Sequence, residues 1–405
     1  MRPGGGRWLR HRVVGAAIVI GVLAACRGRP PGEDRSAARV QHVVDSLVPL
    51  VEQAVGLTFK QPPRWAMRSP EQLREYLRLK FHEQLPPETI AGVETAYRLF
   101  AMIPDSVEIE SVMLRILAQQ VQGFYEPDST TLFLVRDAPL GITLTLAHEL
   151  VHALQDQYLP LHALMDPGRP NDELMALQAV LEGQAQFASV MMIAGDRAES
   201  PSFWDTAAAE AREAAVDQLS GVPLILREAL LFPYLDGARF MYWWSHGTLA
   251  DTVPFGPRMP VSTEQILHPS RYLAGEKPVN VVFTDSSEAV TYQDDLGEFE
   301  IGVLHATLFN LVRPLTDRPI GWNGDRYRVY SSAAGPALVW YTAWDDTTAA
   351  SRFLRGTARR LMEKTAAGYE ASAVRSTVDG VPLVRVSIGP TGWSCDSGCV
   401  AAVEP

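Results

Sequence analysis

Cysteine, histidine and positive charge are all scarce in this chain, and each scarcity argues against a class of metal site or binding partner. The 405 residues include 3 cysteines and 9 histidines. Cys395 and Cys399 have no histidine or further cysteine near them, so a metal site would need nitrogen and oxygen ligands, and a small disulfide in the tail is the expectation for this pair. The net charge of -11 and the pI of about 5.4 argue against nucleic acid or an anionic lipid surface as a partner.

Long hydrophobic runs and internal repeats are also missing. The uncharged run Val13–Ala25 follows four arginines and is too short for a comfortable membrane span, so residues 1–25 are predicted to be a secretory signal peptide. The run ends Leu23-Ala24-Ala25-Cys26, which resembles the lipobox of bacterial lipoproteins. The resemblance implies cleavage before Cys26 and lipidation of that cysteine, and hence an exported protein anchored to the cell envelope. Arg27 follows where an aspartate would favour inner-membrane retention, which favours the outer membrane. An ordinary signal peptide is the alternative.

A mixed, mostly helical fold is predicted for the rest of the chain. Hydrophobic residues make up 47% of the sequence, enough for one large or two moderate domains. Residues 26–36 are predicted to be a flexible tether. Helical patterns dominate from residue 37 to about 274, interrupted by a hairpin signal at 121–125 and 131–135. Strand patterns increase from about residue 275, which predicts a smaller α+β part over 275–405.

One stretch carries a clear chemical pattern, His148-Glu149-Leu150-Val151-His152, within a predicted helix over 141–157. Histidines four residues apart lie on the same helical face, where two imidazoles can bind one Zn²⁺. The carboxylate of Glu149 can then act as a general base on a metal-bound water. The alternative is an amphipathic helix that carries two unrelated histidines.

A catalytic zinc needs a third protein ligand, and Glu182 is the candidate. It is the lone charge between Leu174 and Ala194 in a predicted apolar helix. A carboxylate is costly to bury there without a cation, and Gly183 beside it would allow another backbone to come close. The rival acids Asp166, Asp172 and Glu173 lie in or near a polar loop, where they are more naturally solvated.

His148, Glu149 and His152, with a glutamate on a later helix, resemble the gluzincin branch of zinc metallopeptidases. The resemblance covers about residues 123–189. It implies a zincin-like catalytic region built from a small sheet, the motif helix and a second ligand helix. It also implies an edge strand that pairs with extended substrate, assigned to Thr131, Phe133 and Val135 in the second strand of the hairpin, with an ordinary packed hairpin as the alternative. Where the thermolysin-like pattern has an aspartate to orient a histidine, position 186 is glutamine, so Asp156 is considered for that role, with a solvated helix end as the alternative.

These observations predict a peptidase with one Zn²⁺ that acts on peptide or protein substrates. Tyr234 and His268 are candidates for the donor that stabilises the charge of the transition state, with a core tyrosine and a surface histidine as the alternatives. Two other functions stay open. One is a zinc-stabilised envelope lipoprotein that binds peptides or assists assembly without turnover, and the other is a hydrolase of cell-wall amides that uses the same site.

Overall fold

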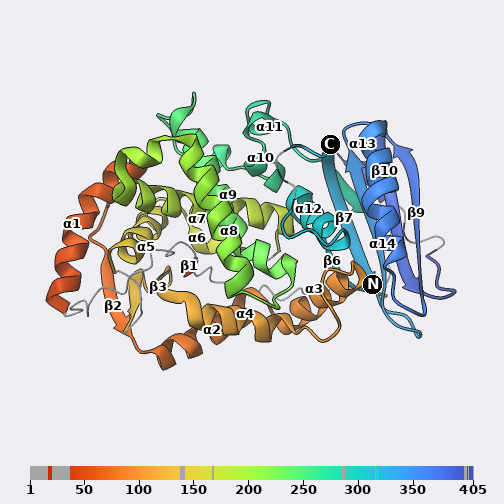
Figure 1. The fold of residues 1–405 in the computed structure, drawn as a ribbon, viewed down its shortest axis with the longest axis horizontal. Helices are drawn as coiled ribbons and strands as arrows, with labels where there is room; N and C mark the ends of the chain where they lie inside the picture. Colours follow the sequence, from red (N-terminus) through yellow and green to blue (C-terminus); the bar gives the residue numbers. More distant parts are fainter. Residues whose placement is uncertain are drawn as a thin grey trace, which may run out of the picture.

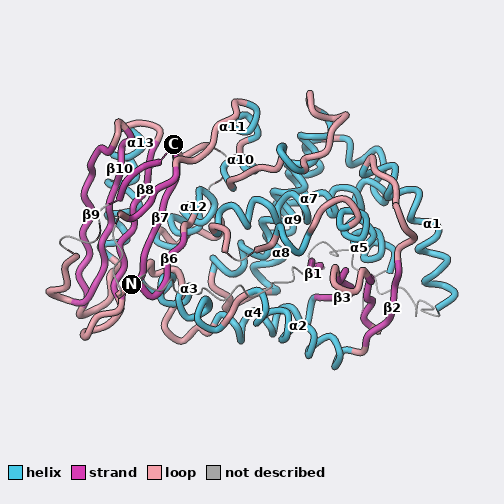
Figure 2. The backbone as a smooth tube through the Cα atoms, turned by 180° about the vertical axis from the view of Figure 1, so that it is seen from behind, coloured by secondary structure: helices cyan, strands magenta, loops and turns pink. Residues whose placement is uncertain are grey.

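The computed structural model describes residues 17–20, 37–136, 142–166, 168–284, 289–314, 316, 318–395, 399 and 401–404. The fold is α+β and mostly α, as predicted (Figure 1). An antiparallel sheet lies at one end of the molecule, and helix α5 (Ile142–Asp156), which carries the His-Glu-His motif, lies toward the other (Figure 2). Within the described residues, no helix is long and apolar enough to cross a membrane. Cys26 and the proposed tether lie outside the described residues.

The order of the elements follows the predicted pattern, with helices first and most strands later. The main helices are α1 (Ala37–Val55), α2 (Pro70–Gln84), α3 (Pro87–Leu99), α4 (Ile109–Gln120), α5 (Ile142–Asp156), α6 (Leu161–Leu164), α7 (Asn171–Ala194), α8 (Pro201–Gln218), α9 (Leu224–His246), α10 (Thr263–Leu267), α11 (Pro269–Leu273), α12 (Gly297–Leu308), α13 (Thr347–Phe353) and α14 (Arg359–Glu363). The strands are β1 (Ala17–Ile20), β2 (Arg64–Arg68), β3 (Val121–Glu126), β4 (Thr131–Val135), β5 (Asn280–Phe283), β6 (Val290–Asp294), β7 (Trp322–Tyr330), β8 (Ala337–Trp344), β9 (Tyr369–Val378), β10 (Val381–Pro390) and β11 (Ala401–Glu404).

The small sheet beside the motif helix has the order β1-β3-β4-β2. The hairpin of β3 and β4 forms as predicted, but β2 pairs in parallel with β4 on its other side. Because the backbone groups of β4 are paired along both of its edges, the prediction that Thr131, Phe133 and Val135 form a substrate edge is wrong. Strand β1 covers the outer edge of β3. Its four residues belong to the segment predicted to be a signal peptide, most of which the structure does not describe.

Helices α7 and α9 pack closely because two glycines meet at their contact. A Cβ atom added to Gly183 would lie 2.3 Å from the backbone carbon of Gly237, and one added to Gly237 would lie 2.1 Å from the carbonyl oxygen of Ala179. Either atom would force the helices apart. The prediction that Gly183 admits a neighbouring backbone is therefore confirmed, and it is α9 that approaches the helix of Glu182.

The C-terminal sheet has the order β6-β7-β8-β10-β9, and every pairing in it is antiparallel. Strand β9 was not predicted. It forms a hairpin with β10 through Asp379 and Gly380, which both adopt positive φ, at 49° and 85°. Strand β11 pairs with β5, and Cys395 and Cys399 form a disulfide with a Cα–Cα distance of 5.9 Å.

Acidic side chains from the C-terminal part cap the beginning of α7. The Asn171 N–H donates to Asp294 and the Asp172 N–H donates to Asp295, each at 2.9 Å. Asp325 does the same for the start of α12. A carboxylate at a helix N-terminus satisfies unpaired N–H groups and interacts favourably with the helix dipole. The two parts of the chain are therefore joined at the helix that carries Glu182.

Candidate metal centre

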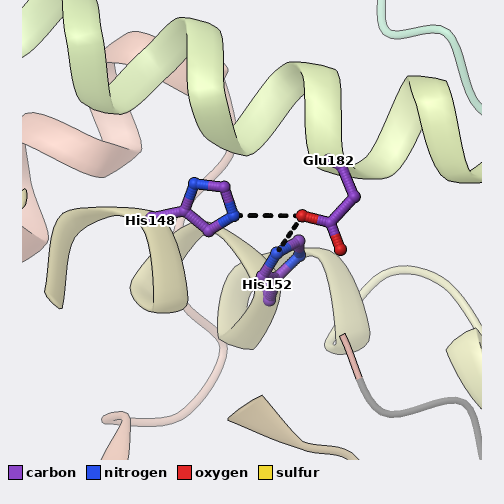
Figure 3. A group of neighbouring side chains, drawn as sticks. All are labelled: His148, His152 and Glu182. Carbon is purple, nitrogen blue, oxygen red and sulfur yellow. Dashed lines mark hydrogen bonds and ion pairs between the residues drawn. The ribbon is translucent and has the colours of Figure 1, made fainter. Parts of the chain in front are cut away.

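Two helices bring the three predicted ligands together (Figure 3). His148 and His152 project from one face of α5, and Glu182 reaches them from α7. The Oε2 atom of Glu182 lies 3.1 Å from Nε2 of His148 and 3.3 Å from Nε2 of His152. All three side chains are buried, and Glu182 is the most exposed at 8%. Among the described residues, they form the group whose ligand atoms converge within 4.8 Å.

This donor set fits a metal ion. Two ligand atoms bound to a tetrahedral Zn²⁺ at 2.0–2.1 Å are separated by about 3.3 Å, close to the separations between Glu182 and the two histidines. The Nε2 atom of His152 makes no close hydrogen bond to any described residue, although it faces the Oε2 atom of Glu182 at 3.3 Å. If both atoms present lone pairs, a cation between them removes the repulsion. The buried His148, His152 and Glu182 could therefore hold a metal ion.

Gln155 orients His152, a role that the sequence pattern does not predict. Its Oε1 atom lies 2.9 Å from Nδ1 of His152, and its Nε2 atom donates to the carbonyl of Leu181 at 3.0 Å and to Oε1 of Gln184 at 2.9 Å. Because the amide oxygen only accepts, Nδ1 carries the proton and Nε2 is left as the ligand atom. Gln155 follows His152 by one helical turn, but glutamine is so common on solvated helix surfaces that its spacing alone does not single it out.

The charges of the three ligands are strongly coupled. Burial disfavours the charged form of His152, but the Glu182 carboxylate outweighs burial and raises the pKa to about 9. For Glu182, burial is outweighed by the two histidines, and the pKa falls to about 2. Burial lowers the pKa of His148. The site therefore stabilises the ionised form of Glu182. Without a metal ion, the proton held by His152 supplies the neighbouring positive charge.

Glu149 is completely buried beside the ligands, with a relative exposure of 0%. Neither of its carboxylate oxygens makes a close hydrogen bond to a described residue, and the backbone N–H of Tyr125 has only a small stabilising effect on the ionised form. Burial raises its pKa to about 8, although the neighbouring His152 opposes this shift. A buried carboxylate without partners is costly and is retained where chemistry requires it.

The other predicted residues fall in different places. The Tyr234 ring on α9 stacks against His148 with a centroid distance of 6.0 Å, so this candidate donor lies at the site. His268 does not, because its Nε2 atom pairs with Glu298 on α12 at 3.0 Å. Asp156 accepts a hydrogen bond from Tyr125 and does not orient a ligand histidine. Of the rival third ligands, Asp172 bonds to Thr263. Glu173 pairs with Arg169, and Asp166 accepts from the Gly168 N–H.

Comparisons with known proteins give little beyond this geometry. Residues 269–389 match a family model described as a domain of unknown function, DUF8575. No curated protein matches the chain. A solved structure from Chloroflexus aurantiacus, described as a candidate hydrolase with a novel fold, is 19% identical. The match covers 60% of this chain and 92% of that one with a TM-score of 0.38, which is too low to support an argument about fold or activity.

Proposed function

We propose that the protein is a zinc-dependent peptidase that hydrolyses peptide bonds with Glu149 as general base. The observation that carries the proposal is the fully buried carboxylate of Glu149, which makes no close hydrogen bond to a described residue, beside three converging ligands. A protein that only binds zinc for stability has no need of a free carboxylate there. The resemblance of His148, Glu149, His152 and Glu182 to the gluzincin pattern supports the same chemistry.

The side chains of this site have distinct roles in the proposed reaction. A zinc ion held by His148, His152 and Glu182 would supply Lewis acidity, which lowers the pKa of water to about 7 and polarises a carbonyl. Glu149 accepts a proton from the attacking water and passes it to the leaving amine. A pKa raised to about 8 suits both steps, because a general base works best with a pKa near the operating pH. Tyr234, which stacks on His148, is the proposed donor to the oxyanion.

We further propose that the enzyme works outside the cytoplasm, tethered through a lipid on Cys26. The support is the sequence alone, namely the arginines before Val13, the short apolar run and the residues Leu23 to Cys26. Labelling with a radioactive fatty acid tests the tether. Wild type should incorporate label, and Cys26→Ser should not.

The function is tested by zinc content and peptide turnover in three variants. Glu149→Gln should retain zinc and lose hydrolysis by about 10²- to 10⁴-fold, since that is the usual contribution of a general base. Glu182→Ala should lose both zinc and hydrolysis. Glu213→Gln, at an exposed position on α8, is the control and should behave as wild type. Full hydrolysis by Glu149→Gln would refute the proposal, and unchanged zinc in Glu182→Ala would remove the third ligand.

A further inference from the structure

A cavity of about 640 Å³ lies along α7, between this helix, α3, α4, α9 and the strands β6 and β7. Most of its wall is apolar and includes Ile90, Ile109, Met113 and Leu226. None of the groups assigned above to the proposed reaction lines it. Its volume is in the range of sites that bind small ligands or several residues of a peptide.

The cavity follows the helical face that carries Glu182. Asn171, Leu174, Met175 and Gln178 line it, and their spacing places them on a single face of α7. The next residue on this face after Gln178 is Glu182, about 6 Å further along the helix axis. Asn171 at the far end is about 16 Å from Glu182 along the same axis. The cavity therefore lies along α7 from Asn171 to Gln178, and Gln178 is one helical turn short of Glu182.

The far end of the cavity contains a buried carboxylate that is only half satisfied. Glu300, which is 2% exposed, accepts hydrogen bonds at Oε1 from the Tyr97 hydroxyl at 2.8 Å and from Asn171 Nδ2 at 3.0 Å. Its Oε2 atom has no partner in the part of the chain that the structure describes. Burial raises the pKa of Glu300 to about 8, so the carboxyl group is mostly protonated at neutral pH until a cation beside it favours the ionised form. Asp294 beside it differs, because the Tyr292 hydroxyl donates to its Oδ2 atom and the backbone N–H groups of Asn171 and Asp295 donate to its Oδ1 atom.

Neither arginine that lines the cavity pairs with Glu300. Arg169 forms an ion pair with Glu173, and the guanidinium of Arg326 lies 3.9 Å from the carboxylate of Asp295. An apolar cavity that ends in a carboxylate with one unsatisfied oxygen matches a ligand with an apolar body and a cationic hydrogen-bond donor at its end. A primary ammonium group is such a donor.

We propose that this cavity is a substrate subsite, and that Glu300 binds a primary ammonium group of the peptide substrate. The inference rests on the proposed function. An extended peptide advances about 3.3 Å per residue, so the distance of about 16 Å places the ammonium group about five residues from the cleaved bond. The group is either the amino terminus of the substrate or a lysine side chain, which share this chemistry.

Peptide binding to the full chain tests the subsite independently of turnover. The protein is the zinc-loaded Glu149→Gln variant, and calorimetry measures its affinity for an alanine–leucine octapeptide with a free or acetylated amino terminus. Acetylated octapeptides with a single lysine at each position form the second arm, with norleucine at the same positions as their control. In at least one of the two arms, the peptide with the ammonium group should bind about tenfold or more tightly than its uncharged control, as a charge-assisted hydrogen bond predicts. The arm that shows the preference identifies the source of the ammonium group.

Three further variants test whether the preference for ammonium-bearing peptides depends on Glu300 and on the cavity. Glu300→Gln should reduce it to less than about twofold while affinity for the uncharged peptide stays the same. Glu264→Gln is the matched control, because Glu264 is also buried with an oxygen that accepts no hydrogen bond from a described residue, but it does not line the cavity. Leu174→Trp fills the cavity and should abolish binding of all peptides without loss of zinc, which keeps the test decisive if Glu300→Gln does not fold.

Two results would overturn the proposed subsite. One is equal affinity for charged and uncharged peptides, and the other is an equal loss of the ammonium preference in Glu300→Gln and Glu264→Gln. Absence of turnover in wild type would contradict the proposed function but not an ammonium preference in binding. The two failures are therefore distinguishable.

Discussion

Replacing Gln155 by leucine tests whether its hydrogen bonds hold the metal centre together. The change keeps the side chain about the same size and removes its bonds to His152, Leu181 and Gln184. Loss of an outer hydrogen bond to a ligand histidine typically weakens metal affinity 10- to 100-fold, or about 1.4–2.7 kcal/mol. The buried groups left without partners should lower the free energy of unfolding by about 1–3 kcal/mol each, partly offset by the apolar side chain.

The assay is a zinc titration in competition with a chelator, combined with urea unfolding with and without zinc. Gln157→Leu is the matched control. Gln157 follows the same helix, but its hydrogen bonds go to Lys60 and Gln61, away from the ligands. This control should lose stability without a change in zinc affinity. Zinc affinity within about twofold of wild type in Gln155→Leu would refute the claim that this residue orients His152.

Two further predictions concern stability. Gly183→Ala should lower the free energy of unfolding by about 1–3 kcal/mol or more and weaken zinc binding, because the added Cβ would collide with Gly237 and displace α7. Chemical unfolding measures the first effect, and no loss would mean that the helices separate at little cost. Burial, with Glu298 nearby, raises the pKa of Glu264 from 4.5 to about 9, so the folded state keeps a proton that the unfolded state loses across this range. Stability should therefore fall as pH rises from 5 to 9, and less steeply in Glu264→Gln than in wild type, as urea unfolding across this range would show. Parallel slopes would contradict the assignment.

The parts of the site that could be predicted from sequence are those that depend on local geometry or on a single unusual residue. His148 and His152 lie four residues apart on one helix, so their proximity follows from the helical repeat. Glu182 lies on another helix, yet it stood out because a lone charge in an apolar segment needs a partner. Gln155 did not stand out, because its importance depends on Leu181 and Gln184, which only the packing of α5 on α7 brings near.

The errors in the predicted fold have two different causes. The edge assignment for Thr131–Val135 failed because β2, a short segment with an arginine at each end, pairs with β4 from more than sixty residues away. Strand periodicity cannot reveal such a non-local partner. Strand β9, in contrast, is followed by a usable signal, since Asp379-Gly380 is a favoured two-residue hairpin turn. The acidic network at the start of α7 was also unpredicted, because it joins Asp294 and Asp295 to a helix that lies far away in sequence.

X-ray absorption spectroscopy at the zinc edge tests the central claim most directly. For the purified full chain loaded with one equivalent of zinc, the account predicts two imidazole nitrogens from His148 and His152. It also predicts oxygen ligands that include the Glu182 carboxylate, all at about 2.0–2.2 Å. The imidazole signal should be lost in a His148→Ala, His152→Ala double variant. A sulfur ligand at about 2.3 Å, or an unchanged imidazole signal in the double variant, would contradict it.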